Sequence, residues 1–146
     1  MPVYPCYGLV MVLTDDTIVS ILTTTKRIAV VGLSDRATRP SYGVAAFLIG
    51  RGYDVVGVNP ALAGQTVLGR PVVATLAEAA PLDMIDVFRA SDQAGAVVRE
   101  AMALGARTVW LQLGVIDDAA ADEATAAGLR VVMDRCPLIE WQRLGL

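Results

Sequence analysis

A run of four aliphatic residues followed by a glycine constrains the fold of this chain more than any other feature. The run is Ile28–Val31, and the glycine is Gly32. A strand of continuous aliphatic residues must be covered on both faces, which is typical of a central strand in a parallel sheet. The sequence therefore predicts an α/β fold around this strand. Sheets of this kind collect ligands at the carboxyl ends of their strands.

Strand and helix patterns alternate along the rest of the chain. We expect strands over 27–33, 54–58, 72–73, 84–88, 108–111 and 130–133. We expect helices over 15–24, 40–51, 91–104, 118–127 and 137–144, a turn of helix over 76–79 and an irregular segment over 61–70. This alternation predicts a three-layer, doubly wound parallel sheet, Rossmann-like, with strand order 3-2-1-4-5 and a sixth strand at the edge.

The chain is expected to form one domain over residues 14–146. Thr14 is predicted to cap the helix over 15–24, and Ser91 or Asp92 the helix over 91–104. Residues 1–13 are expected to be a poorly structured extension, or to precede a natural start at Met11. This apolar segment is too short to cross a bilayer, which needs about 20 apolar residues.

Charge and composition exclude several classes of function. The net charge is −3, which gives no basic field for nonspecific binding to nucleic acid. No basic run is present to hold a membrane surface. The chain contains no histidine, so no mechanism within it uses imidazole as a base, a metal ligand or a phosphorylated carrier.

The two cysteines, Cys6 and Cys136, are far apart and belong to no Cys-x-x-Cys pair. This usage favours the reducing cytoplasm and gives no support to a metal site. Arg135 beside Cys136 would lower the pKa of a reactive thiol, but Asp134 opposes that effect. We favour an unreactive structural cysteine, and the reactive alternative stays open.

The loop after the first strand has features that suit anions. Gly32 lets the backbone turn sharply and approach a ligand closely. The helix start near Ser41 carries the partial positive charge that attracts phosphate. Arg36 and Arg39 add two guanidinium groups that can grip phosphate oxygens in pairs. The alternative is that both arginines are simply solvated.

The same region disfavours a nicotinamide cofactor. The glycine after Gly32 is Gly43, so the Gly-x-Gly-x-x-Gly pattern of dinucleotide-binding folds is missing. The second strand ends in Asn59-Pro60, where an acidic residue would bind the ribose hydroxyls of such a cofactor. Asn59 also suits a simple turn cap, a role compatible with lining a site.

Seven motifs in order carry a resemblance to a known family. They are Gly32-Leu-Ser, Arg39-Pro-Ser-Tyr, Gly52-Tyr53 with Val58-Asn-Pro, Leu68-Gly, Asp86-Val-Phe-Arg89, Trp110-Leu-Gln-Leu-Gly114, and Val132-Met-Asp-Arg-Cys136-Pro with Ile139-Glu140. From about Asp15 to the end, the chain resembles the small stand-alone CoA-binding proteins, whose fold resembles the CoA-binding domain of the succinyl-CoA synthetase α subunit. One departure is Leu138, at a position that is often lysine in such proteins.

The resemblance implies a site for CoA or an acyl-CoA. The CoA phosphates would lie near the first loop, the adenosine end near Asn59, and the pantetheine side near Gln112 to Gly114. Phe88 and Arg89 would form the opposite wall, although an aromatic residue at a strand end is more often core. The predicted binding residues are Gly32, Leu33, Ser34, Arg36, Arg39, Pro40, Ser41, Asn59, Pro60, Phe88, Arg89, Gln112 and Gly114, with no catalytic residue and no metal.

Three functional hypotheses follow. The first is a cytoplasmic module that binds CoA or a short acyl-CoA noncovalently and has no catalytic constellation of its own. The second is a CoA-supplying component of an acyl-transfer or acid-thiol ligase reaction, which needs a partner subunit because the related synthetases use a phosphorylated histidine in another domain. The third is an NAD(P)-binding oxidoreductase or redox sensor. A homodimer or a partner protein stays open.

Overall fold

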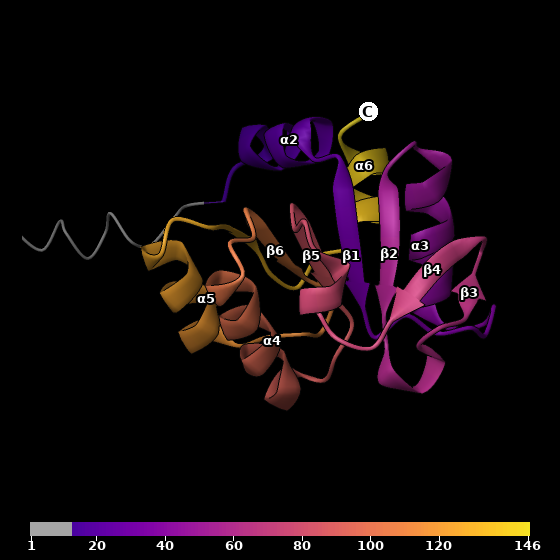
Figure 1. The fold of residues 1–146 in the computed structure, drawn as a ribbon. Coiled ribbons are helices and arrows are strands. Elements are labelled where there is room, and N and C mark those ends of the chain that lie inside the picture. Colours follow the sequence, from indigo (N-terminus) through magenta and orange to yellow (C-terminus); the bar gives the residue numbers. More distant parts are fainter. Residues whose placement is uncertain (1–12) are drawn as a thin grey trace, which may run out of the picture.

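In the described part of the chain, residues 13–146 of this computed structural model, seven strands form one sheet in the order β3-β4-β2-β1-β5-β6-β7 (Figure 1). They are β1 (Arg27–Val31), β2 (Asp54–Val58), β3 (Thr66–Val67), β4 (Arg70–Val73), β5 (Met84–Val87), β6 (Thr108–Leu111) and β7 (Arg130–Val132). Neighbouring strands pair in parallel, except that β3 is antiparallel to β4. The predicted order of the parallel strands is confirmed, including the sixth at the edge.

Helices cover both faces of the sheet. They are α2 (Asp15–Thr24), α3 (Pro40–Gly50), α4 (Ser91–Ala103), α5 (Asp118–Ala126) and α6 (Pro137–Arg143), with 3-10 turns η1 (Pro60–Leu62) and η2 (Ala77–Ala79). Buried residues of α2 and α3 form one hydrophobic cluster, against which α6 also packs, and buried residues of α4 and α5 form the other. This arrangement confirms the three-layer, doubly wound fold.

The central strand β1 divides its side chains between the two layers. Ile28 and Val30 belong to the cluster beneath α2 and α3, whereas Ala29 and Val31 belong to the cluster beneath α4 and α5. This division follows from the period of two along a strand. All four residues are buried, which is why the sequence here is aliphatic without interruption.

Helix starts agree with the sequence in two cases and differ in a third. Thr14 Oγ1 accepts a hydrogen bond from the Thr17 amide at 3.2 Å, as predicted for the cap of α2. Pro40 is the first residue of α3. The cap predicted for α4 is wrong, because the helix begins at Ser91 after Ala90 and has no side-chain cap. The Ser91 hydroxyl instead bridges to the loop after β6, where it donates to Gly114 O and accepts from Ile116 N.

The segment over 61–70 is more ordered than predicted. It contains the end of η1 and the strand β3, which pairs with β4 across a turn at Leu68 and Gly69. Both turn residues have positive φ, 55° for Leu68 and 75° for Gly69. A two-residue strand has no measurable period, and leucine is an unusual residue in this backbone region. For these reasons the sequence pattern did not predict the hairpin.

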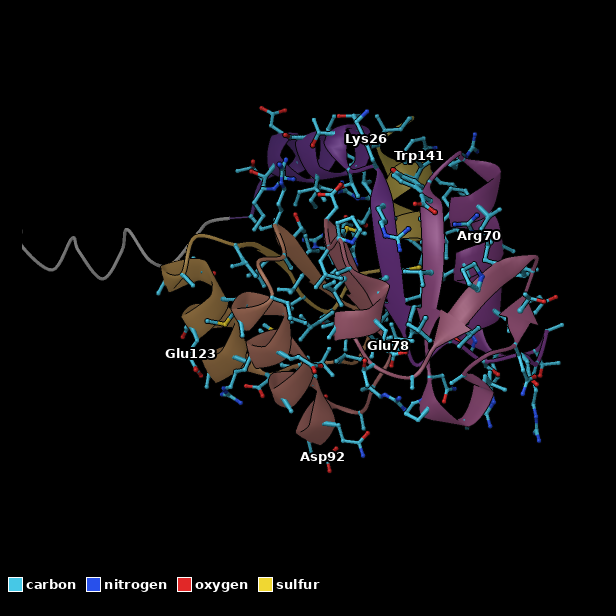
Figure 2. All side chains as sticks on the ribbon, viewed as in Figure 1. Lys26, Arg70, Glu78, Asp92, Glu123 and Trp141 are labelled. Carbon is cyan, nitrogen blue, oxygen red and sulfur yellow. The ribbon has the colours of Figure 1, made fainter. Side chains whose placement is uncertain are left out.

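Helix α6 is anchored to the rest of its layer by Trp141. The indole makes edge-to-face contacts with Phe47, at 6.3 Å between ring centroids, and with Tyr53, at 6.2 Å. Figure 2 shows Trp141 beside β2. Leu13 also packs against this layer. The rest of the predicted extension, residues 1–12, lies outside the described residues. Within residues 13–146, no helix is long and apolar enough to span a membrane.

Candidate functional site

A cavity of about 430 Å³ opens where the carboxyl ends of β1, β2 and β5 meet. The chain winds in opposite directions from β1, toward β2 on one side and toward β5 on the other, so this is the switch point of the sheet. We call it the anion cavity. Its lining residues are Gly32, Ser34, Asp35, Arg36, Arg39, Pro40, Ser41, Asn59, Ala61, Leu62 and Phe88.

Gly32 makes the turn at the base of the anion cavity. Strand β1 ends at Val31, two residues earlier than predicted, because Gly32 has a φ of +91°. A Cβ atom built there would lie 3.2 Å from the Phe88 carbonyl oxygen. The Gly32 amide donates to Val58 O at 2.9 Å, which fixes the loop to the end of β2. Both the backbone angle and the close approach to Phe88 therefore require glycine here.

Leu33 anchors the loop in the core and does not line the anion cavity. Its side chain is buried over Gly57 in β2, where an added Cβ would lie 2.6 Å from Leu33 Cδ2. Asn59 Nδ2 donates to the Leu33 carbonyl oxygen at 2.9 Å. The loop is therefore held by packing below and by a hydrogen bond at its side, before any ligand binds.

Two serines connect the loop to helix α3. The Ser34 amide donates to the hydroxyl of Ser41 at 3.0 Å, and Ser34 Oγ accepts from the Arg36 amide at 3.1 Å. Ser41 is in the first turn of α3, and Arg39 at the cap position supplies no side-chain hydrogen bond. The first N–H groups of a helix have no partner within the helix. The positive end of α3 therefore faces the anion cavity.

Arg36 and Arg39 are the cations of the anion cavity. Both are exposed, and neither forms an ion pair with any residue in 13–146. The lining contains one carboxylate, Asp35, which makes no ion pair within the same residues. Two guanidinium groups against one carboxylate leave the lining with an excess of positive charge.

The far wall of the anion cavity follows β2. Asn59 caps η1, since its Oδ1 accepts from the Ala61 amide at 3.0 Å. With Nδ2 on Leu33 O, both ends of the Asn59 amide have partners, so the residue shapes the wall. Pro60 is exposed and outside the lining, and Ala61 and Leu62 take its place. These two residues lie in the segment predicted to be irregular, and no chemical signal in the sequence marked them.

A second cavity, of about 460 Å³, adjoins the first. Pro40 and Phe88 line both cavities and form the wall between them. Phe88 is half-buried and packs against the hydrophobic cluster of α2 and α3, so it is both core and lining. We call this space the apolar cavity. Its lining residues are Pro40, Gly43, Val44, Phe88, Gln112, Leu113, Val115, Cys136 and Leu138.

Gln112 is the one amide in the lining of the apolar cavity, and it is buried at the end of β6. Its amide is oriented with the nitrogen toward Asp86, because only this orientation pairs a donor with the carboxylate oxygens. The nitrogen then donates to Asp86 Oδ1 at 2.8 Å and to Oδ2 at 3.3 Å. Asp86 is in β5 and has no exposed surface. Burial raises the pKa of its carboxyl well above the usual value.

Two other predicted residues lie outside both linings. Arg89 is half-buried and follows Phe88. Gly114 closes the loop after β6, where its amide donates to Asp134 Oδ1 at 2.7 Å. Cys136 and Leu138, in contrast, line the apolar cavity although the sequence did not place them there. They come from the start of α6, and only the packing of α6 against α3 brings them to Phe88.

Comparisons with known proteins bear on the family and the fold of this chain. The profile of the CoA-binding domain matches residues 26–142. The uncharacterised protein YneT of Bacillus subtilis (strain 168) is 38% identical over 117 residues, which cover 80% of this chain and 85% of YneT. A solved structure of a hypothetical protein from Pyrococcus horikoshii OT3 superposes with a TM-score of 0.85 at 35% identity, covering 92% of this chain and 94% of that one. A Thermus thermophilus structure also gives 0.85, at 34% identity and 90% and 99% coverage. The resemblance found in the sequence is confirmed, and this chain belongs to the CoA-binding domain family.

Proposed function

We propose that this protein binds CoA or a short acyl-CoA noncovalently, with the phosphates in the anion cavity and the pantetheine arm in the apolar cavity. The observation that carries the proposal is the pair Arg36 and Arg39, which line the anion cavity without an acidic partner in residues 13–146. Membership of the CoA-binding domain family supports CoA among the phosphorylated ligands.

The charges of the two cavity linings support this division of the ligand. CoA has a highly charged nucleotide end and an uncharged arm, and the two cavities differ in the same way. The anion cavity has two guanidinium groups and the positive end of α3. The apolar cavity is lined by no charged side chain from the described part of the chain. Because Pro40 and Phe88 border both, one ligand can occupy the two cavities together.

Within this proposal, each of the other predicted residues has a position relative to the ligand. The wall formed by Asn59 and Ala61 borders the adenosine end, and Gln112 borders the pantetheine arm. Arg89 meets a phosphate only if its side chain turns toward the ligand from outside the present linings. Gly114 acts on the site only through the loop that it closes.

The proposal is one of binding and includes no catalytic step in this chain. Cys136 is the one thiol in the described residues, and none of their hydrogen bonds joins it to an acid or a base. Ligation through a phosphorylated histidine would need another chain, since this one has no histidine. Incubating the protein with acetyl-CoA and measuring free thiol tests this point. Release of CoA-SH above the rate in buffer alone would favour an acyl-transfer role.

Isothermal titration with CoA, ADP and NAD⁺ tests the binding itself. We expect saturable binding of CoA, weaker binding of ADP, which lacks the 3′-phosphate and the arm, and none of NAD⁺. The affinity for CoA should fall as salt rises from 50 to 500 mM, because ions screen exposed guanidinium groups. Saturable binding of NAD⁺ without binding of CoA would overturn the proposal.

A further inference from the structure

The apolar cavity has a property that goes beyond CoA binding. Among residues 13–146, no charged side chain lines this cavity, and the polar groups of its lining are few. Its volume, about 460 Å³, lies in the range of small-molecule pockets. A site of this composition discriminates between ligands that bury hydrocarbon and ligands that bury a charge. Burial of an unpaired ionised carboxylate is strongly unfavourable, whereas burial of methylene groups is favourable.

The floor of the apolar cavity adds to this discrimination. Gln112 is 5% exposed, and its amide nitrogen is held by Asp86, which is fully buried. A ligand carboxylate at this wall would approach a second carboxyl group and would find no guanidinium or ammonium partner in the lining. Burial raises the pKa of the Asp86 carboxyl, and a ligand carboxylate brought close to it would raise that pKa further.

We propose that the apolar cavity holds the acyl group of an acyl-CoA, and that it selects short, uncharged aliphatic acyl groups against acyl groups that carry a free carboxylate. This inference rests on the proposed function, because it places the acyl group in the same cavity as the pantetheine arm, at the end of the arm that enters past Phe88. Pro40 and Phe88 line both cavities, and this adjacency supports the path.

The main experiment compares CoA, acetyl-CoA, butyryl-CoA and succinyl-CoA by isothermal titration at one pH. We expect butyryl-CoA to bind more tightly than acetyl-CoA, by up to about fourfold for each added methylene that is buried. Succinyl-CoA should bind at least about tenfold more weakly than butyryl-CoA. Equal affinities for succinyl-CoA and butyryl-CoA would overturn this inference and leave CoA binding intact. If none of the four binds, the proposed function fails and the inference fails with it.

A charge-swap variant sharpens the comparison. Leu138 lines the apolar cavity and is half-buried, so Leu138→Lys adds an ammonium group at its edge. We expect this variant to gain affinity for succinyl-CoA and to lose affinity for butyryl-CoA. Ile139→Lys is the matched control, because Ile139 is the next residue of α6, is 46% exposed and lies outside the lining. If both variants change the preference equally, the effect is a general one of charge and the inference is wrong.

A volume variant tests the same cavity without adding charge. Gly43 lines the apolar cavity, and a Cβ atom built on it meets nothing within 4 Å. Gly43→Leu should therefore fill the cavity, while the helix propensity of leucine favours the fold. We expect butyryl-CoA to lose its advantage over CoA, whereas ADP, which has no pantetheine arm and reaches only the anion cavity, should keep its affinity within about threefold. An unchanged preference for butyryl-CoA would show that the acyl group lies elsewhere.

Discussion

The arginines at the two ends of the parallel sheet differ in whether they form ion pairs. At the amino ends of the strands, Arg27 and Arg70 both pair with Asp54, and the Arg27–Asp54 distance is 2.6 Å. Arg27 also donates to Ala79 O at 3.0 Å, and Figure 2 shows Arg70 beside β2 and β4. At the carboxyl ends, Arg36 and Arg39 have no such partner within residues 13–146.

The difference shows how one residue type serves two purposes. The paired arginines satisfy carbonyl and carboxylate groups of their own chain, so their removal should affect folding. The unpaired arginines lie in a concave site at the switch point of the sheet, so their removal should weaken the binding of a ligand. Helix α6 follows the first pattern, since Arg135 and Arg143 both reach the buried carboxylate of Glu140, at 2.8 and 2.9 Å. Burial opposes ionisation of Glu140, but the hydrogen bonds from these arginines outweigh it and lower its pKa.

The largest expected effect comes from removing both cations of the anion cavity. The double variant Arg36→Ala, Arg39→Ala should weaken CoA binding by about 100-fold, because each charged hydrogen bond to phosphate contributes about tenfold or more. Its thermal stability should stay close to that of the original protein. The measurement is titration with CoA beside a thermal unfolding curve.

A charge control for that variant is Arg107→Ala, which removes one positive charge instead of two. Arg107 is exposed, lies outside both cavity linings and forms no ion pair in residues 13–146, so its removal changes charge without touching the site. A similar loss of CoA affinity in Arg107→Ala would mean that overall charge, rather than the two cavity arginines, governs binding.

A second prediction concerns the turn at Gly32, between β1 and the loop that lines the anion cavity. Gly32→Ala places a Cβ atom 3.2 Å from the Phe88 carbonyl oxygen in a backbone region that favours glycine. We expect a loss of about 1–3 kcal/mol in the free energy of unfolding. Urea unfolding measures it. Gly64→Ala is a useful control, because its φ is also positive, at +86°, and nothing lies within 4 Å of its Cβ position. A loss in the control equal to that in Gly32→Ala would show that the contact with Phe88 adds nothing.

A third and smaller effect is expected at the amino ends of the strands. Asp54→Asn breaks two partly exposed ion pairs, so the free energy of unfolding should fall by about 1 kcal/mol at low salt, and the difference should shrink as salt rises. The affinity for CoA should not change. If Asp54→Asn weakened the affinity for CoA and left the stability unchanged, the amino ends of the strands would serve binding rather than folding, which contradicts the comparison.

The fourth prediction concerns Asp86. Its effect on the free energy of unfolding is limited, because a buried carboxyl can take up a proton and so avoid burying a charge. Its folded pKa is raised above the usual 3.8, so the folded state binds the proton more tightly than the unfolded state. The contribution of Asp86 to stability is therefore greatest below about pH 4 and is lost as the pH rises through the folded pKa. Asp86→Asn should remove this part of the decline, as urea unfolding from pH 4 to 8 can show. An identical pH profile in the variant would contradict the prediction.

Much of the fold follows from local patterns. The unbroken aliphatic run of β1 predicts a central strand because both faces are covered, and the order of parallel strands follows from the alternation with helices. The hairpin of β3 and β4 was not predicted, because its strand has two residues and its turn begins at Leu68 with positive φ. Ser91 looked like a helix cap, but its hydroxyl bonds a distant loop, and such a partner cannot be seen in a local pattern.

Some predicted site residues line a cavity because of their place in the first loop, whereas others depend on packing against distant residues. Residues of the first loop, such as Ser34 and Arg39, line the anion cavity because the loop follows a strand directly. Leu33 stands in the same motif but faces the core, since Gly57 leaves room for it there. Their contact with CoA stays a prediction until a ligand is measured.

The sequence by itself determined the class of fold, the position of the loop after β1 and its arginines, because strand period, glycine and helix start are local properties of the chain. Only the tertiary structure decided that Cys136 and Leu138 share a cavity with Phe88 and that Asp86 lies beneath Gln112. These neighbours come from separate strands and helices. Their approach depends on how the layers pack, and packing is a property of the whole chain.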